Sequence, residues 1–310
     1  MQPSETATRA ERVLAEVERA VVGKREALEL VLLGILADGH VLLEDFPGLA
    51  KTLLARSFAQ AADVEFTRVQ FTPDLLPADI TGSAIFNQRD NEFEFRPGPI
   101  FPTLLLADEV NRAPPKTPAA LLEAMQERQV TSGRTTRKLA PPFVVIATQN
   151  PIEYEGTYPL PEAQLDRFMV RIELGYPEPW EEADMLEGHA AGDLVAELEP
   201  VADLDDVRGA QAAVAAVHGS TELRRYVVAL AEATRRDPRL ELGASPRAAL
   251  MLFRAAKALA ALEGRGHVLP DDVQALAGSV LSHRLLLAPG VPESDREAIV
   301  ADAVETVPAL

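Results

Sequence analysis

The sequence predicts an α/β domain with a parallel central sheet, followed by a smaller helical domain. Up to residue 150, short apolar runs typical of buried strands alternate with segments of helical periodicity, as parallel sheets require. After a Pro-bearing stretch at residues 176–179, Ala- and Leu-rich segments with charged faces continue to residue 310, and no strand is expected there. We therefore expect two domains, at residues 1–178 and 179–310.

The elements of the first domain follow one another in a regular order. Apolar positions at helical spacing predict two helices within residues 11–36, separated by a break at residues 21–24. Buried-type strands are expected at residues 40–43, 65–70, 103–107 and 143–147, and a helix at residues 51–62. Residues 71–102 are rich in Pro, Gly, Asn and Asp, and two short apolar runs there predict a protruding hairpin.

The charge balance excludes some classes of partner. The 310 residues include 48 acidic and 30 basic side chains, which gives a net charge of −18. A field of this sign repels nucleic acid and anionic lipid, so we expect no nucleic-acid partner. The chain has no cysteine, no basic and apolar leader at its N-terminus and no run of 18 apolar residues. These features predict a cytoplasmic protein that is not inserted in a membrane.

The segment from Asp45 to Thr52 lies between a predicted strand and a predicted helix and resembles a phosphate-binding P-loop. In such a loop, backbone N–H groups cradle phosphate, the Lys51 ammonium reaches the terminal phosphates and the Thr52 hydroxyl binds Mg²⁺. Two positions depart from the pattern, because Asp45 and Ala50 stand where glycines are usual. Ala50 fits if this position has helical dihedral angles, and Asp45 fits if its charge points away from the phosphates. The alternative is a glycine-containing turn that caps a core helix.

Two further strands end in polar chemistry. The strand at residues 103–107 delivers Asp108 and Glu109 at its carboxyl end, where α/β sheets place ligand sites. Asp108 is suited to hold Mg²⁺, and Glu109 to act as general base on water, although a carboxylate pair here also suits a helix N-cap. The strand at residues 143–147 leads to Asn150, which either contacts the γ-phosphate or forms a turn before Pro151.

These segments together resemble the MoxR family of AAA+ ATPases, over residues 21–287. The resemblance rests on the sequences at residues 42–52, 70–82, 107–112, 147–151, 161–168 and 243–247. It implies an AAA+ P-loop domain followed by an all-helical lid, with ATP and Mg²⁺ as cofactors. It also assigns nucleotide contacts along the loop and at the adenine side, namely Val22, Gly23, Pro47, Gly48, Leu49, Ala50, Lys51, Thr52 and Leu53.

The same resemblance assigns two arginines to catalysis. It implies that Arg167 enters the ATP site of a neighbouring subunit and that Arg247 contacts nucleotide from the lid; guanidinium donors stabilise charge on a transferring phosphoryl group. From the residues alone, a surface ion pair is the favoured explanation for each arginine. The resemblance further identifies residues 71–102 as a helix-2 insert and residues 127–138 as a pre-sensor-1 hairpin.

The function that the resemblance implies is ATP-driven remodelling of partner proteins by a hexameric ring. The expected client bears a von Willebrand factor A domain, and metal insertion is the expected context. A nucleotide-gated switch with negligible hydrolysis is the alternative, which measured turnover distinguishes. A DNA-remodelling motor is disfavoured by the net charge of −18. The helical domain carries no expected catalytic cluster, and His218, His267 and His283 are expected to be surface or interface residues.

Overall fold

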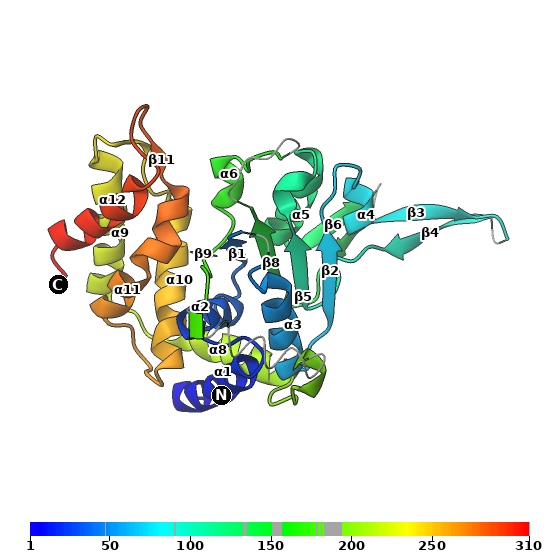
Figure 1. Ribbon diagram of the computed structural model, residues 1–310, viewed down its shortest axis with the longest axis horizontal. Helices are drawn as coiled ribbons and strands as arrows, with labels where there is room; N and C mark the ends of the chain where they lie inside the picture. The colour runs from blue at the N-terminus through cyan, green and yellow to red at the C-terminus, as the bar shows by residue number, and fades with distance from the viewer. Residues whose placement is uncertain are drawn as a thin grey trace.

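The computed structural model describes residues 1–46, 48–89, 91–132, 135–150, 157–177, 179–180, 182 and 194–309. Figure 1 shows a central sheet flanked by helices, with a helical region on one side and a long hairpin on the other. Residue 178, the expected domain boundary, lies outside the described residues, so the boundary stays a prediction.

A five-stranded parallel sheet in the order β2-β5-β8-β1-β9 forms the centre of the first region. The strands are β1 (Val41–Glu44), β2 (Phe66–Gln70), β5 (Leu104–Asp108), β8 (Val144–Gln149) and β9 (Val170–Ile172). Four of the five match the expected apolar runs, whereas the three-residue β9 was not expected. Because all pairs are parallel, the carboxyl ends of the strands lie along one edge of the sheet.

Both faces of the sheet are buried, as the continuous apolar strands predict. In β5, Leu104 and Leu106 belong to one apolar cluster, and Leu105 and Ala107 belong to another on the opposite face. The first cluster includes side chains from α1 (Pro3–Glu18), α2 (Arg25–Leu36) and α3 (Lys51–Ala61), and the second from α5 (Lys116–Glu127). The two expected helices before the sheet are confirmed, with α1 starting earlier than the periodicity indicated.

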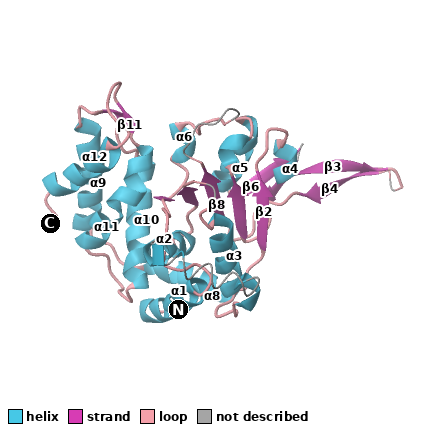
Figure 2. Cartoon of the chain, viewed as in Figure 1, coloured by secondary structure: helices cyan, strands magenta, loops and turns pink. Residues whose placement is uncertain are grey.

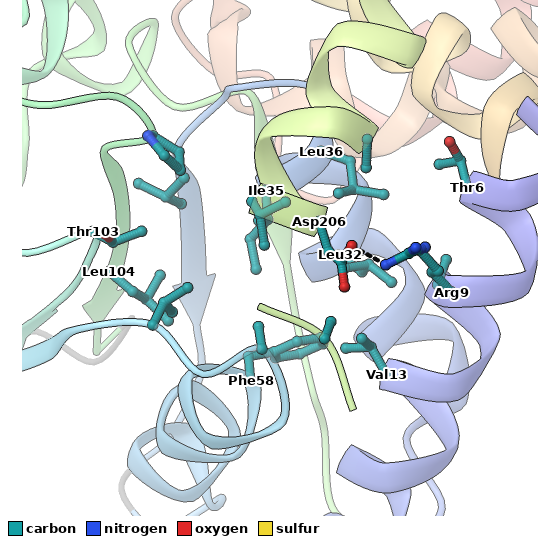
Figure 3. A pocket seen from close by; sticks show the side chains of 18 residues that line it. Thr6, Arg9, Val13, Leu32, Ile35, Leu36, Phe58, Thr103, Leu104 and Asp206 are labelled. Atoms are coloured by element: carbon teal, nitrogen blue, oxygen red, sulfur yellow. Dashed lines mark hydrogen bonds and ion pairs between the residues drawn. The ribbon is translucent and has the colours of Figure 1, made fainter. Parts of the chain in front are cut away.

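A small gap in the first cluster lies where α1, α2, α3 and α8 (Leu204–Ala216) meet near β5, and Figure 3 shows the side chains around it. Its volume is about 50 Å³, and Val13, Leu32 and Phe58 are among the apolar residues that line it. The ion pair between Arg9 and Asp206 joins α1 to α8 beside this gap. The gap is a feature of core packing, and its apolar walls offer little to a polar ligand.

His40 anchors the start of β1 to neighbouring elements. Its Nδ1 accepts the backbone N–H of Val145 at 3.0 Å, so its Nε2 carries the hydrogen and donates to the carbonyl of Met125 at 3.3 Å. The ring is 5% exposed and packs edge-on against Phe143. Burial, together with the nearby positive charge of Arg128, lowers the pKa of His40 to about 3, so the imidazole is neutral.

Two antiparallel hairpins confirm the expected inserts. After the short α4 (Pro77–Thr81), strands β3 (Gly82–Asn87) and β4 (Glu92–Pro97) form a ribbon that extends away from the body of the molecule (Figures 1 and 2). Strands β6 (Gln129–Ser132) and β7 (Thr135–Lys138) form the second hairpin. The turn residues 133–134 lie outside the described residues.

In the residues that the structure describes, the second region is helical apart from one small sheet. Its helices are α9 (Thr221–Arg236), α10 (Pro246–Leu262), α11 (Pro270–Leu281) and α12 (Asp295–Thr306). The expectation of no strand after residue 178 is wrong in one respect, because β10 (Leu240–Leu242) pairs with β11 (Leu286–Leu287). These strands are too short to give a period-2 signal in the sequence. Within the described residues, no helix is both long enough and apolar enough to span a membrane.

The three histidines that the structure describes in this region divide into two groups. His218 and His267 are exposed as expected, and they form an isolated bridge between their backbones. His283 is 1% exposed, so the expectation of a surface or interface position is wrong for it. It lies in the 3-10 turn η3 (Ser282–Arg284) after α11, where Nε2 meets the carbonyl of Phe168 at 3.2 Å. Packing of α11 against the start of β9 buries this ring.

Candidate functional site

A cavity of about 270 Å³ lies at the carboxyl edge of the sheet. It brings together the loop after β1, the start of α3 and the ends of β2, β5 and β8. The residues that line it are Gly48, Leu49, Ala50, Lys51, Thr52, Leu53, Arg68, Gln70, Asp108, Glu109 and Asn150. Three segments that the sequence singled out separately thus meet in one place.

The loop between β1 and α3 reaches the helix through two left-handed residues. Gly48 has φ +88°, and Ala50, directly before the first residue of α3, has φ 54° and ψ 17°. The condition under which alanine fits without strain, helical dihedral angles at this position, is therefore not met. A left-handed alanine places its Cβ close to the following carbonyl, at a cost of about 1 kcal/mol. The loop keeps the backbone geometry that glycine usually supplies at this position.

Lys51, the first residue of α3, folds back over the loop. Its Nζ donates to the carbonyls of Asp45 and Phe46, the latter at 3.1 Å. Burial is the largest influence on the pKa of Lys51 and lowers it, while the carboxylates of Asp45 and Asp108 oppose this shift. The ammonium is therefore half-buried, close to acidic groups and within the cavity that a phosphate would occupy.

The charge of Asp45 points away from the cavity. Its side chain is 5% exposed, and its two oxygens accept the backbone N–H groups of Phe46 at 2.9 Å and Gly175 at 2.7 Å. Gly175 follows β9, so Asp45 ties the loop to the far edge of the sheet. This arrangement meets the condition under which an aspartate is compatible with a phosphate-binding loop.

Thr148 on β8 orients both members of the acidic pair. Its hydroxyl donates to Asp108 Oδ1 at 2.6 Å and accepts the backbone N–H of Glu109 at 2.8 Å. Glu109 adopts φ 55° and ψ 53°, which turns its side chain out of the line of β5. Asp108 is 7% exposed. A buried hydroxyl thus fixes where each carboxylate points.

Two residues of β2 that sequence reasoning missed contact the same carboxylates. Arg68 donates through Nε at 3.0 Å and Nη2 at 2.7 Å to Asp108 Oδ2. Gln70 donates through Nε2 to Glu109 Oε2 at 2.7 Å, and Arg112 Nη1 reaches the same oxygen at 2.7 Å. Arg68 and Gln70 are two positions apart, so they lie on one face of β2. The sequence did contain one signal for this site, because two polar residues, Arg68 and Gln70, flank Val69, which is buried in β2.

The remaining predicted residues divide between the cavity and a second hollow. Thr52 and Asn150 line the cavity, and the carbonyl of Asn150 accepts from Asn111 Nδ2 at 3.1 Å. Gly23, with φ +74°, lines a hollow of about 760 Å³ bounded by α2, β9, α11 and η3. Val22 is half-buried and does not line this hollow, and Pro47 lies outside the described residues.

Arg167 and Arg247 lie together but line neither hollow. Arg247 at the start of α10 approaches Asp166 at 3.6 Å, and burial and the charge of Arg247 lower the pKa of Arg167. Arg167 Nε is buried without a hydrogen-bond partner among the described residues. Asp166 also binds Arg284, whose side chain is 1% exposed, through Nε at 3.0 Å. Arg167 and Arg247 thus lie close enough for their charges to interact, and Asp166 pairs with Arg247 and Arg284.

The oxygen donors of the cavity suit a hard divalent cation. The Thr52 hydroxyl and the Asp108 carboxylate are ligands of the kind that Mg²⁺ prefers, and Mg²⁺ usually takes its other ligands from phosphate and water. Next to a lysine and a left-handed loop at a helix start, this donor set fits a magnesium nucleotide.

Comparisons with known proteins agree with this geometry. A model of the ATPase family associated with various cellular activities (AAA) matches residues 40–170, and a model of the AAA lid domain matches residues 232–305. The chain is 45% identical to Chaperone MoxR1 of Mycobacterium tuberculosis over 89% of this chain and 75% of that protein. It is 35% identical to Protein MoxR of Paracoccus denitrificans, over 94% and 92% of the two chains.

The chain belongs to the MoxR family of AAA+ ATPases. A further relative, the protein YeaC of Bacillus subtilis, is 47% identical over 94% of this chain and 91% of its own length. A crystal structure of a candidate ATPase from Cytophaga hutchinsonii superposes with a TM-score of 0.90 at 40% identity, over 99% and 97% of the two chains. The MoxR-family fold therefore extends over nearly the whole chain, including the helical region.

Membership of the MoxR family gives the two hollows a common reading. The 270 Å³ cavity holds the P-loop and the acidic pair, and the 760 Å³ hollow adjoins β9 and the helical region. In an AAA+ protein, residues of these kinds serve nucleotide binding.

Proposed function

We propose that this MoxR-family protein hydrolyses Mg-ATP to ADP and phosphate within a ring of identical subunits and uses the energy to remodel partner proteins. The observation that carries the proposal is the convergence of Lys51, Thr52 and the Asp108-Glu109 pair on one cavity. Cation, metal ligand and base then lie within reach of one triphosphate.

Each residue of the cavity has a role in this proposal. The N–H groups of Gly48, Leu49 and Ala50 at the start of α3 bind phosphate, with Leu53 beside them, and Lys51 Nζ leaves its loop carbonyls for the β- and γ-phosphates. Thr52 and Asp108 hold Mg²⁺, which supplies charge neutralisation on the phosphate oxygens. Glu109 takes a proton from the attacking water as the bond from the γ-phosphorus to ADP breaks, and Asn150 orients that water.

The paired arginines support a composite site between subunits. Because Arg167 lines neither hollow of its own chain, we propose that it acts on the nucleotide of a neighbouring subunit, while Arg247 contacts nucleotide from the lid. Guanidinium groups supplied in trans stabilise the charge that develops on the transferred phosphoryl group. Turnover then requires assembly, for which we propose a hexameric ring.

Protein clients are the proposed substrates of remodelling. The β3–β4 ribbon supports contact with a partner, because Phe86 and Phe93 form a tilted ring pair across it, with centroids 5.3 Å apart, and Phe93 is 73% exposed. The net charge of −18 argues against a nucleic-acid client. We propose a protein with a von Willebrand factor A domain as the client, in metal insertion or complex maturation in the cytoplasm.

We also propose that residues 1–178 and 179–310 form the two domains.

A second candidate function is a nucleotide-gated switch with negligible hydrolysis. The contacts of Glu109 with Gln70 and Arg112 favour it, because a general base held by two donors is less available to water. The two functions differ in turnover, since a switch binds ATP without releasing phosphate.

The deciding experiment is steady-state phosphate release with Mg-ATP over a range of protein concentrations. We compare the wild type with Glu109→Gln, Arg167→Ala and Arg247→Ala, and measure ATP binding for each. The ring ATPase predicts turnover per subunit that rises with concentration and is lost in all three variants while ATP binding is retained. Wild-type turnover equal to that of Glu109→Gln at every concentration, with and without a client protein, would instead establish the switch.

A further inference from the structure

The contact between Arg68 and Asp108 places a cation on the carboxylate proposed to hold the metal. Both Arg68 nitrogens, Nε and Nη2, donate to the same oxygen, Asp108 Oδ2, at 3.0 and 2.7 Å. The other oxygen, Oδ1, accepts from Thr148 at 2.6 Å. The Thr148 contact belongs to the buried framework of the site, so Oδ2 is the oxygen that faces an incoming ligand. A metal ion and the Arg68 guanidinium therefore compete for it.

Arg68 is far more exposed than the carboxylate with which it pairs. Its side chain is 47% exposed, against 10% for that of Asp108. It lies on β2 and lines the cavity. Its Nη2 also donates to Gln70 Oε1 at 2.7 Å, which gives the guanidinium a second neighbour on its own strand. A long, half-exposed side chain changes rotamer at low cost compared with the buried carboxylate.

The destination of the released guanidinium is set by the cavity. Arg68 lines the same cavity as Lys51 and Thr52, which are proposed to contact the terminal phosphates and the metal. Guanidinium groups bind phosphate oxygens through parallel N–H donors, so the group that leaves a carboxylate finds an equivalent anion close by. The carboxylate and the guanidinium each gain a new partner of opposite charge, because a divalent cation and a phosphate chain arrive together.

From these contacts we propose that Arg68 is a positioning residue that occupies Asp108 Oδ2 in the nucleotide-free protein and transfers to the phosphate chain when nucleotide binds, which leaves Oδ2 to the metal. This inference rests on the proposed function of the cavity and adds a residue to it. Its consequence is that free metal binds weakly, whereas metal and nucleotide bind together. An ion pair that merely joins β2 to β5 would affect neither metal nor nucleotide affinity.

Two binding measurements on the full-length protein test the exchange. The first is Mn²⁺ binding to nucleotide-free protein, followed by electron paramagnetic resonance. The second is the affinity of a fluorescent ATP analogue in buffer with EDTA, where no metal contributes. The variants are Arg68→Ala, Arg68→Lys, which keeps the charge but not the paired donors, and Arg112→Ala. Arg112 is a matched control, because it forms a half-exposed ion pair with the neighbouring carboxylate Glu109.

The expected results distinguish the direct contact of Arg68 with Asp108 Oδ2 from a general effect of removing a positive charge. Arg68→Ala should bind Mn²⁺ about tenfold more tightly than the wild type and the ATP analogue about tenfold more weakly. The affinities of Arg68→Lys for both ligands should lie between those of the wild type and Arg68→Ala. Such intermediate affinities would show that the effect of Arg68→Ala does not come from misfolding. Arg112→Ala should change Mn²⁺ affinity by about twofold or less, because its charge does not contact Oδ2.

Two outcomes would overturn the proposed role of Arg68. Equal Mn²⁺ binding by the wild type and Arg68→Ala, including no measurable binding by either, overturns the competition. Tighter Mn²⁺ binding with unchanged affinity for the ATP analogue overturns the transfer to phosphate. Neither measurement depends on hydrolysis, so failure of this inference is distinguishable from failure of the ATPase function, which would appear as absent turnover in the wild type.

Discussion

Thr148 donates its hydroxyl hydrogen to Asp108 Oδ1 at 2.6 Å from the neighbouring strand of the sheet. The same oxygen atom of Thr148 accepts the N–H of Glu109, so one side chain holds two carboxylates in register. Such supporting contacts are worth about 10- to 100-fold in the activity of metal sites.

Replacing Thr148 with Val tests this support. Val keeps the volume but leaves Asp108 Oδ1 and the Glu109 N–H without their partner. We expect kcat for ATP hydrolysis to fall about 10- to 100-fold and the free energy of unfolding to fall by about 1–3 kcal/mol. Thr148→Ser keeps the hydroxyl and should retain most activity. Wild-type kcat in Thr148→Val would show that the contact does not position the pair.

Ala50 provides a test of backbone strain in the loop. Because Ala50 has φ 54°, Ala50→Gly should leave stability unchanged or raise it by up to about 1 kcal/mol, measured by denaturant unfolding. Ala212 in the middle of α8 is exposed, and Ala212→Gly should destabilise by about 1 kcal/mol as an ordinary helical position does. Equal losses in the two variants would contradict the left-handed geometry of Ala50.

His40 makes stability depend on pH. Its pKa is about 3 in the folded protein because of burial and lies near its ordinary value of about 6.5 in the unfolded chain. Between these values only the unfolded state binds the proton, so this contribution to stability is complete above pH 6.5 and is lost as pH falls. The expected slope is about 1.4 kcal/mol per pH unit. Burial also lowers the pKa of His283, which acts in the same direction.

The measurement is denaturant unfolding from pH 7 to pH 4 for the wild type and His40→Gln. Gln retains one donor and one acceptor but does not titrate, so its stability should fall less steeply between pH 6 and pH 4. Parallel curves for the two proteins would show that His40 is not the group responsible.

Substitutions at Asp166 and Arg247 should distinguish a residue that stabilises the fold from one that serves ATP hydrolysis. Arg284 is buried, and burial lowers its pKa to about 10 despite the opposing charge of Asp166. Asp166→Ala leaves this guanidinium buried without its carboxylate and should lower the free energy of unfolding by about 3 kcal/mol. Arg247→Ala removes a half-exposed pair and should cost less than about 1 kcal/mol while abolishing turnover. A large stability loss in Arg247→Ala would indicate a structural role for Arg247.

Sequence patterns predicted the parts of the molecule that depend on local chemistry. The apolar runs that became β1, β2, β5 and β8 and the polar residues at their ends were readable, because strand burial and loop composition are local properties. The contact of Asp45 with Gly175 was not readable, since it joins residues 130 positions apart in the chain. The left-handed Ala50 was also missed, because the geometry of the surrounding loop overrides the preference of alanine.

The positions of Arg68 and His283 were also missed, because each depends on contacts between different elements of the fold. Arg68 follows from the register of β2 and β5, which places Gln70 opposite Asp108 and brings Arg68 to the same face. His283 is buried because α11 packs against β9, and no periodic signal in its own segment indicates this. Tertiary contacts decided both positions, and neither contact has a local signature.

The first apolar cluster has a consequence for how the lid can move. It runs without interruption from the sheet through α1 and α2 to α10, and Arg254 on α10 donates to the carbonyl of Asp38 at 3.2 Å. A wide opening about a flexible linker would expose these apolar surfaces to water. Packed helices can instead slide past one another by small shear displacements while their contacts persist. We therefore expect conformational change during the nucleotide cycle to travel as shear between α1, α2 and α10, so that the lid and the sheet respond as a mechanically continuous body.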